Sequence, residues 1–254
     1  MIESTTHSDA PSAASLDFTS LSGVIGAVAD VERLRSASPS SFDAASKFWR
    51  VPMNSPHLTA RMKELILVGM HASVTTLNVD AVERHIRRAQ AAGASDSDIV
   101  DVLVTIVAVA NHALYFSMPI LQEELEAAGA VGVEDDPYDP QLEKIKQDFM
   151  ESRGFWNTDR EPLARLIPDY YHALNDISTE SWRNGSLTPK ERSLVCIGID
   201  CTVTHSYEPG LRRHIRNALK YGATRDEILD VFQLSGMIGL ETYIAGARFL
   251  GLED

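Results

Sequence analysis

Two histidines occupy matching positions in two similar stretches of this sequence. His85 lies in the tetrad Arg84-His85-Ile86-Arg87, and His214 lies in Arg213-His214-Ile215-Arg216, 129 residues further along the chain. Histidine titrates near neutral pH and can pass protons during catalysis, and neighbouring arginines can hold a carboxylate. The pattern indicates acid/base chemistry on an acidic substrate. The structural alternative is that each histidine caps or supports a helical hairpin, with most of the arginines on a solvated helix face.

The two histidines belong to a tandem repeat. Residues 58–121 can be laid without a gap on residues 187–250, at a constant offset of 129. The match is ordered, because a Leu-Thr pair begins both copies and a Gly-Ala pair follows both tetrads. A repeat of this length usually decides the fold. A polar residue kept at one place in both copies also suggests a paired or interfacial site.

Each copy is predicted to form three helices. The start and stop signals are a threonine N-cap, a glycine C-terminus and a capping box; they are Thr59, Gly93 and Ser95–Asp98 in one copy and Thr188, Gly222 and Thr224–Glu227 in the other. The third helices, about 96–127 and 225–250, are apolar around much of their circumference, which predicts burial in a bundle or a subunit interface. Pro119 is expected to kink or end the first of them. No segment shows strand alternation, so we predict an all-α fold in which two tandem helical repeats form one compact unit.

The rest of the chain is divided around these copies. Residues 1–20 lack both the basic start and the apolar run of a secretory signal, and they predict a disordered tail on a cytoplasmic protein. The first helical repeat is expected over residues 21–129 and the second over 141–254. Residues 130–140, acidic and with two prolines, are the predicted linker.

Composition and motifs exclude several classes of protein. The net charge of -13 argues against binding to nucleic acid or anionic lipid, and no segment is expected to be long and apolar enough to span a membrane. Cys196 and Cys201 lie five residues apart on a predicted helix and point too far apart to pair. There is no Gly-x-Gly-x-x-Gly, P-loop or Gly-x-Ser-x-Gly, so nucleotide and serine-hydrolase functions have no support.

Three segments of the second copy carry a family resemblance. They read LTPKERSLV at residues 187–195, LRRHIRNAL at 211–219 and GATRDEI at 222–228. This pattern resembles the carboxymuconolactone decarboxylase family, which shares its fold with the alkylhydroperoxidase-D-like proteins; the first copy resembles it more weakly. The peroxidase branch needs a Cys-x-x-Cys pair before the histidine. The matching segments hold no cysteine, so thiol peroxidase chemistry is excluded.

The resemblance implies a cofactor-independent decarboxylase, or a related lyase or isomerase, acting on a small cyclic or aromatic-derived oxo acid or lactone. Such a reaction needs a group that stabilises an enolate and an acid that reprotonates carbon. His214, in the better-matching copy, is the first candidate for the acid, with His205 and His85 as further catalytic candidates. The candidate substrate-binding residues are Tyr207, Arg213, His71, Asp200, His112, Glu241 and Tyr243. The resemblance also implies a homo-oligomer, expected to be a trimer.

Differences between the copies suggest where the chemistry is concentrated. Thr76 stands opposite His205, and His71 opposite Asp200, at the same offset. In the first pair only one copy has an ionisable side chain, and in the second pair a base stands opposite an acid. The copies are therefore predicted to have diverged toward one composite, asymmetric site.

Two other functions remain open at this stage. A metal site could be assembled from five imidazole and carboxylate side chains, although their spacings match no metal motif; they are His71, His112, Asp200, His205 and Glu241. The chain could also be a non-catalytic binding or assembly protein that keeps the fold for its oligomeric surface, since the apolar third helices support this hypothesis equally well.

Overall fold

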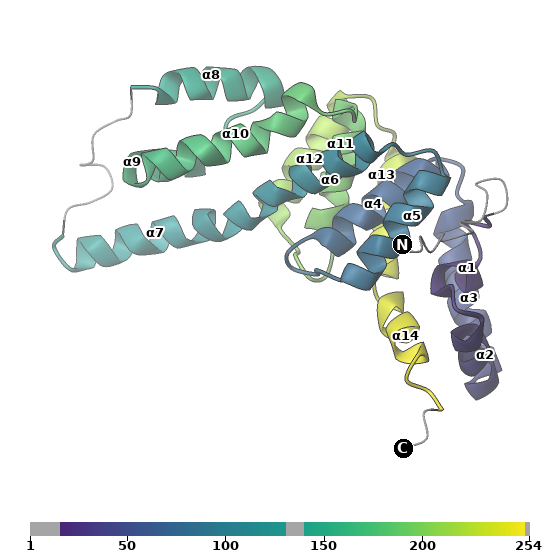
Figure 1. Cartoon of the computed structure of the whole chain (residues 1–254). Helices are drawn as coiled ribbons and strands as arrows, with labels where there is room; N and C mark the ends of the chain where they lie inside the picture. The colour runs from purple at the N-terminus through teal and green to yellow at the C-terminus, as the bar shows by residue number, and fades with distance from the viewer. Residues whose placement is uncertain (1–15, 131–139, 252–254) are drawn as a thin grey trace, which may run out of the picture.

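The computed structural model describes residues 16–130 and 140–251. Within these ranges the chain consists of helices joined by turns, with no strand (Figure 1). This confirms the predicted all-α fold. Residues 1–15 of the predicted tail and residues 131–139 of the predicted linker lie outside the described ranges.

The elements follow one another in this order: α1 (Leu21–Ile25), α2 (Val28–Ala37), α3 (Pro39–Asn54), α4 (Ala60–Ala72), α5 (Val79–Ala91), α6 (Asp96–Val107), the 3-10 helix η2 (Ala108–Asn111), α7 (His112–Ala127), α8 (Leu142–Arg153), the 3-10 helix η4 (Thr158–Arg160), α9 (Glu161–Leu166), α10 (Pro168–Asn184), α11 (Pro189–Asp200), α12 (Glu208–Lys220), α13 (Arg225–Met237) and α14 (Leu240–Ala247).

The two sequence copies form the same three-helix unit, α4–α6 and α11–α13. Thr59 and Thr188 each accept a hydrogen bond from the backbone N–H three residues on, as N-caps do. Gly93 and Gly222 have φ of 93° and 86°, a conformation that glycine adopts without the steric cost of a Cβ. The capping boxes at the starts of α6 and α13 are both present. The predicted start and stop signals are therefore confirmed.

Helices α4 and α11 pack against each other at two glycines. A Cβ on Gly69 would lie 2.9 Å from Val195 Cγ1, and a Cβ on Gly198 would lie 2.7 Å from Met70 Cε. Both separations are shorter than carbon atoms keep in van der Waals contact. The recurrence of glycine at this position is thus explained by close packing of the two helices, which form the centre of the main apolar core.

Each copy also places a buried basic side chain near the other copy. Arg192 on α11 donates to Asp101 on α6 at 2.6 Å, and both side chains are 2% exposed. Lys63, its counterpart on α4, donates to the backbone oxygen of Ser55 at 2.6 Å. Ser55 Oγ in turn donates to Asp230, the counterpart of Asp101. Because a buried charge is costly unless it is paired or hydrogen-bonded, these links hold the two copies in a single unit.

The third helices are interrupted at a different place from the one predicted. In the first copy the break is η2, and α7 continues through Pro119. The expectation that Pro119 could end this helix was therefore wrong. In the second copy, α13 and α14 are separated at residues 238–239.

The helical run 96–127 corrects a second expectation. By length and composition alone it is apolar enough to cross a membrane, with a mean hydropathy of 1.9 over 18 residues. The core helix of a globular protein passes the same test. Ile99, Val102 and Ile106 on α6 are buried in the main core, which accounts for the apolar character of the first half of the run.

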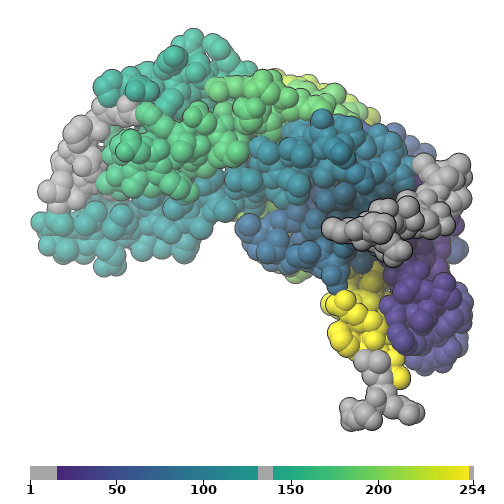
Figure 2. All heavy atoms as spheres, in the orientation of Figure 1, coloured from purple at the N-terminus to yellow at the C-terminus, as the bar shows by residue number. Residues whose placement is uncertain are grey.

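The segment between the copies forms an arm with α7. Helix α7 runs beside α9 and α10, and α8 covers α10 from the other side (Figure 1). Leu142, Leu163 and Tyr171 form a separate apolar core here, against which Tyr115 and Met118 of α7 pack. Helices α1–α3 and α14 extend from the main core in another direction, so the molecule is bent (Figure 2). The arm places its own side chains next to the second copy.

Candidate active site

Most of the predicted site residues lie in two clusters. The first cluster consists of Glu64, His71, Arg84, His85 and Glu241, and the second cluster consists of His112, Asp200, His205, Tyr207, Arg213 and His214. Each cluster takes a helical hairpin from one copy and one residue from the terminal helix of the other copy, α14 or α7. The residues expected to form one composite site are therefore divided between the two hairpins, each of which receives one residue from the other copy.

The two clusters are built on the same backbone. Leu77 and Ser206, at the repeat offset, both have positive φ, 37° and 47°. The N–H of the residue after each donates, at 3.0 Å, to the carbonyl oxygen of His71 in one copy and of Asp200 in the other. This tight turn brings the second helix of each hairpin, with its histidine, back against the end of the first helix.

The acid and the base have exchanged places between the clusters. In the first cluster, His71 on the hairpin lies 3.8 Å from Glu241 on α14. In the second cluster, Asp200 on the hairpin lies close to His112 on α7. One scaffold therefore holds one imidazole and one carboxyl at these two positions in both copies, in opposite order.

The first cluster is closed by ion pairs. Glu64 Oε2 lies 2.8 Å from His85 Nδ1, and Arg88 Nε donates to Glu64 Oε1 at 2.9 Å. Arg84 Nη2 donates to both oxygens of Glu241, at 2.5 and 2.6 Å. Burial opposes ionisation of Glu241, but the neighbouring His85 ring and the charge of Arg84 outweigh it and lower the pKa of this carboxyl to about 2. Two carboxylates thus balance two guanidinium groups.

Tyr243 makes no hydrogen bond and no ring contact with either cluster among the described residues. Its ring packs against the small apolar core that contains Val31, Leu34 and Ala247, and its hydroxyl has no hydrogen-bond partner within the described residues. The structure therefore does not bring Tyr243 together with the other predicted substrate-binding residues.

The second cluster is looser and more exposed. His112 Nδ1 and His205 Nε2 are 2.9 Å apart, and the His112 ring stacks on Tyr207 with ring centroids 3.7 Å apart. Asp200 has one oxygen 3.6 Å from His205 Nε2 and the other 3.9 Å from His214 Nε2. Both distances exceed a hydrogen bond, so this carboxyl faces two imidazoles without binding either directly.

Burial shifts the pKa values of the ionisable side chains in the second cluster and so determines which of them is protonated. It lowers the pKa of His112 and of His214 to about 3, and neighbouring positive charges add to the effect. It also lowers the pKa of His205 and raises that of Asp200 to about 8, because burial disfavours the charged form of each group. At neutral pH the imidazoles are neutral and Asp200 holds a proton. The near-neutral pKa expected for His214 is therefore not found in this environment.

Three arginines face the second cluster without a carboxylate partner. Arg153 and Arg160, which are 7% and 6% exposed, come from the segment between the copies, and Arg213 comes from α12. Arg160 lies over the Phe149 ring and Arg213 over the Phe155 ring. Arg153 Nε and Arg160 Nη1 are buried without a hydrogen-bond partner, and no ion pair to a carboxylate forms at any of the three within the described residues. The sequence indicated Arg213, but no repeated position marked the other two.

These side chains surround a small cavity of about 60 Å³. Its walls include the three arginines, Asp200 and His214. A water molecule needs roughly 10–15 Å³ of such space, so the cavity has room for about four to six water-sized groups. It can admit a small ligand or the reacting part of a larger one.

Each cluster also contains three atoms that could act as metal ligands, all within 4.8 Å of one another; they belong to His71, His85 and Glu241 in the first cluster and to His112, Asp200 and His205 in the second. The five residues suggested for a single metal site are thus divided. The rings of His71 and His85 are parallel to within 5°, so their nitrogen lone pairs do not converge on one ion, and zinc would need to lie about 2.0–2.1 Å from each. In the second cluster the three guanidinium groups repel a cation. Neither donor set fits a divalent metal as arranged.

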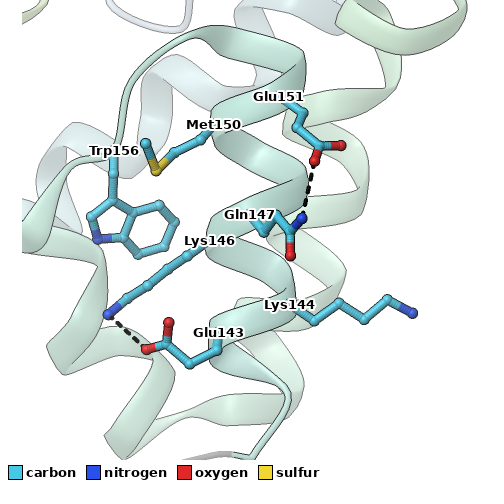
Figure 3. A pocket seen from close by; sticks show the side chains of 7 residues that line it. All are labelled: Glu143, Lys144, Lys146, Gln147, Met150, Glu151 and Trp156. Atoms are coloured by element: carbon cyan, nitrogen blue, oxygen red, sulfur yellow. Dashed lines mark hydrogen bonds and ion pairs between the residues drawn. The ribbon is translucent and has the colours of Figure 1, made fainter.

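A larger hollow lies on the outer side of the arm. It measures about 710 Å³ and is lined by α8 residues and Trp156. Figure 3 shows Trp156 beside Met150, with Lys146 bonded to Glu143. Lys146 also pairs with Glu161 at 2.9 Å. The hollow contains no residue of either cluster, whereas the smaller cavity is lined by residues of the second cluster.

Known proteins share this sequence pattern and this fold. Residues 168–242, which contain most of the second copy and the helix before it, match the model of the carboxymuconolactone decarboxylase family. A solved structure from Burkholderia xenovorans LB400, described as a "putative gamma-carboxymuconolactone decarboxylase subunit", is 34% identical in sequence and has a TM-score of 0.83. The similarity covers 91% of this chain and 92% of that one. No curated protein matches the sequence.

Proposed function

Because the chain belongs to the carboxymuconolactone decarboxylase family, we propose that it is a carboxy-lyase whose active site is the second cluster. Its substrate is a small lactone or oxo acid with more than one carboxylate. The observation that carries this proposal is the group of three arginines, Arg153, Arg160 and Arg213, which surround the cavity without a carboxylate partner in the described part of the chain.

The charge of the second cluster supports a polyanionic substrate. Three guanidinium groups face a carboxyl, Asp200, that is protonated at neutral pH because burial raises its pKa to about 8. An unpaired buried charge costs several kcal/mol, and an anionic ligand removes this cost when it binds. Paired forks of arginine also fix a carboxylate in one orientation. A ligand with two carboxylates would neutralise most of the excess charge.

The same groups can carry out loss of carbon dioxide. When the C–C bond to the departing carboxylate breaks, its electron pair moves into a conjugated carbonyl of the substrate, and a guanidinium stabilises the enolate oxygen that forms. The protonated carboxyl of Asp200 then transfers its proton to carbon and becomes a carboxylate. Water returns a proton to Asp200 through His205, which lies 3.6 Å from it and is partly exposed.

This proposal changes the role expected of His214. As a buried neutral imidazole 3.9 Å from Asp200, it lines the cavity beside that carboxyl and does not hold the proton that the reaction needs. His112 and Tyr207, stacked on each other, would form the wall of the cavity. The first cluster, with His85, then has no part in the chemistry.

An arginine substitution with a neighbouring control tests the proposal. Arg213→Gln should lower kcat/KM for decarboxylation of a lactone or oxo diacid by about 100-fold, because a charge-assisted contact of about 2–3 kcal/mol is lost. Arg212→Gln removes the adjacent arginine, which is exposed and paired with Glu208, and should leave kcat/KM within about twofold. Equal rates for the two variants would remove Arg213 from the site. Tight binding of such acids without any product would favour the non-catalytic hypothesis.

We also propose that the protein is a homo-oligomer. Helix α7 has no fully buried residue in the single chain, and Phe116, Ile120 and Leu121 on it are 72%, 44% and 43% exposed. An apolar surface of this kind is typical of a subunit interface. The number three remains a prediction from the family resemblance, and sedimentation equilibrium measures it directly.

A further inference from the structure

The carboxylate of Glu241 sits in the first cluster as a bound ligand would. It enters from α14 of the second copy, while the side chains around it belong to the first copy. Arg84 Nη2 donates to both of its oxygens, at 2.5 and 2.6 Å, and Asn78 Nδ2 donates at 3.3 Å. The Nε2 atoms of His71 and His85, both nearly fully buried, lie 3.8 and 4.0 Å away. One carboxylate thus has its charge neutralised by side chains from a different part of the chain.

The second cluster has the same plan without such an occupant. The counterparts of the four surrounding residues are Arg213, Tyr207, Asp200 and His214, at the repeat offset, and all four line the cavity. The position of Glu241 is taken by His112, which brings no negative charge. The arginine that binds a carboxylate in one cluster therefore lacks one in the other.

We infer that the first cluster is a second carboxylate-binding site of the same design, filled by the chain's own Glu241. If this side chain is shortened, the site will take a small free monocarboxylate such as acetate in its place. The comparison with the second cluster rests on the proposed function, since it takes that cluster as the anion-binding one. The first cluster itself is tested without reference to any activity.

Rescue by acetate is the test. Glu241→Ala should lower Tm by about 5–10 °C, because it leaves the partly buried Arg84 without its partner. Sodium acetate at about 50 mM should then raise the Tm of this variant by at least about 2 °C more than sodium chloride does. Glu241→Ala combined with Arg84→Ala should lose this gain. Thr242→Ala, an exposed neighbour on α14, should respond as the unmodified protein does, which corrects for acetate bound in the second cluster.

The reciprocal change in the second cluster gives an independent readout. His112→Glu should supply Arg213 with an internal carboxylate and bind a small dicarboxylate such as succinate at least about tenfold more weakly in calorimetry than His112→Gln, which also lacks the imidazole but adds no charge. The inference is overturned if acetate does not rescue a folded Glu241→Ala variant, or if it rescues the double variant equally. If Glu241→Ala does not fold, equal succinate affinity in the two His112 variants overturns it instead. Rescue of the first cluster without succinate binding by the unmodified protein would leave the inference standing and contradict the proposed function.

Discussion

Replacement of Asp200 by asparagine should stabilise the protein at alkaline pH and have little effect in acid. Burial raises the pKa of this carboxyl from 3.8 to about 8. Between these values the folded protein holds a proton that the unfolded chain has released, so the stability contributed by Asp200 is present below pH 4 and is lost as pH rises to 8. About four pKa units at roughly 1.4 kcal/mol each correspond to about 5–6 kcal/mol above pH 8. Asparagine has nearly the same shape and does not ionise, so it avoids this loss.

Urea unfolding at pH 5.5, 7.0, 8.5 and 9.5 measures the effect. The free energy of unfolding of Asp200→Asn, minus that of the unmodified protein, should increase by about 1.4 kcal/mol per pH unit up to pH 8 and then level off. Asp43→Asn, at an exposed position on α3, is the control and should show no such trend. A difference that stays constant with pH would show that Asp200 is already ionised in the folded protein. The proposed proton donor would then be lost as well.

Two further predictions concern stability. Burial lowers the pKa of His112 and His214 to about 3, so the unfolded chain takes up protons below pH 6.5 that the folded one does not. In the Asp200→Asn variant, which removes the opposing titration of Asp200, the free energy of unfolding should fall by up to about 2–3 kcal/mol per pH unit between pH 6 and 4, and a flat urea midpoint across this range would contradict those pKa values. Arg192→Gln should cost about 3–5 kcal/mol in urea unfolding, because it leaves Asp101 buried without its charged partner. Addition of Asp101→Asn should recover part of this loss, and additive costs for the two changes would show that the pair is not coupled.

The fold could be predicted from the sequence because its signals are local and occur twice. A threonine N-cap or a glycine with positive φ depends only on its neighbours in the chain, and Thr59 and Gly93 gave the same information as Thr188 and Gly222. The break in the third helix was missed for the opposite reason. Pro119 is a strong helix breaker in isolation, yet α7 continues through it, while η2 interrupts the run at a stretch, Ala108–Asn111, that contains no breaker.

The candidate site could be predicted only in part. The pairs at the repeat offset, such as His71 with Asp200, did indicate positions that lie in the two clusters. Helix α7 of the first copy meets the hairpin of the second copy, and α14 of the second copy meets the hairpin of the first. This arrangement could not be inferred, because repeat matching aligns His112 with Glu241 but does not show which hairpin each one contacts. Arg153 was missed because no counterpart in the first copy marks it, and its burial results from packing of the arm against the second copy.

The electrostatic difference between the clusters explains how one scaffold gives two unlike sites. In the first copy Glu64 binds Arg88, and Glu241 binds Arg84, so each guanidinium has its own carboxylate. In the second copy serine and asparagine replace Glu64 and Arg88 at the repeat offset, which removes one pair entirely. Histidine in place of Glu241 then leaves the remaining arginine, Arg213, without a partner.

The arm between the copies adds Arg153 and Arg160 to this already cationic cavity. Two more buried positive charges would only destabilise a cavity that stayed empty of anions. Arg153 also helps to keep His214 neutral, and Arg160 does the same for His112. Their cost is offset only when negative charge enters. The segment between the two repeats is therefore what gives the second cluster, and not its counterpart, the excess of positive charge on which the proposed binding of an anionic substrate rests.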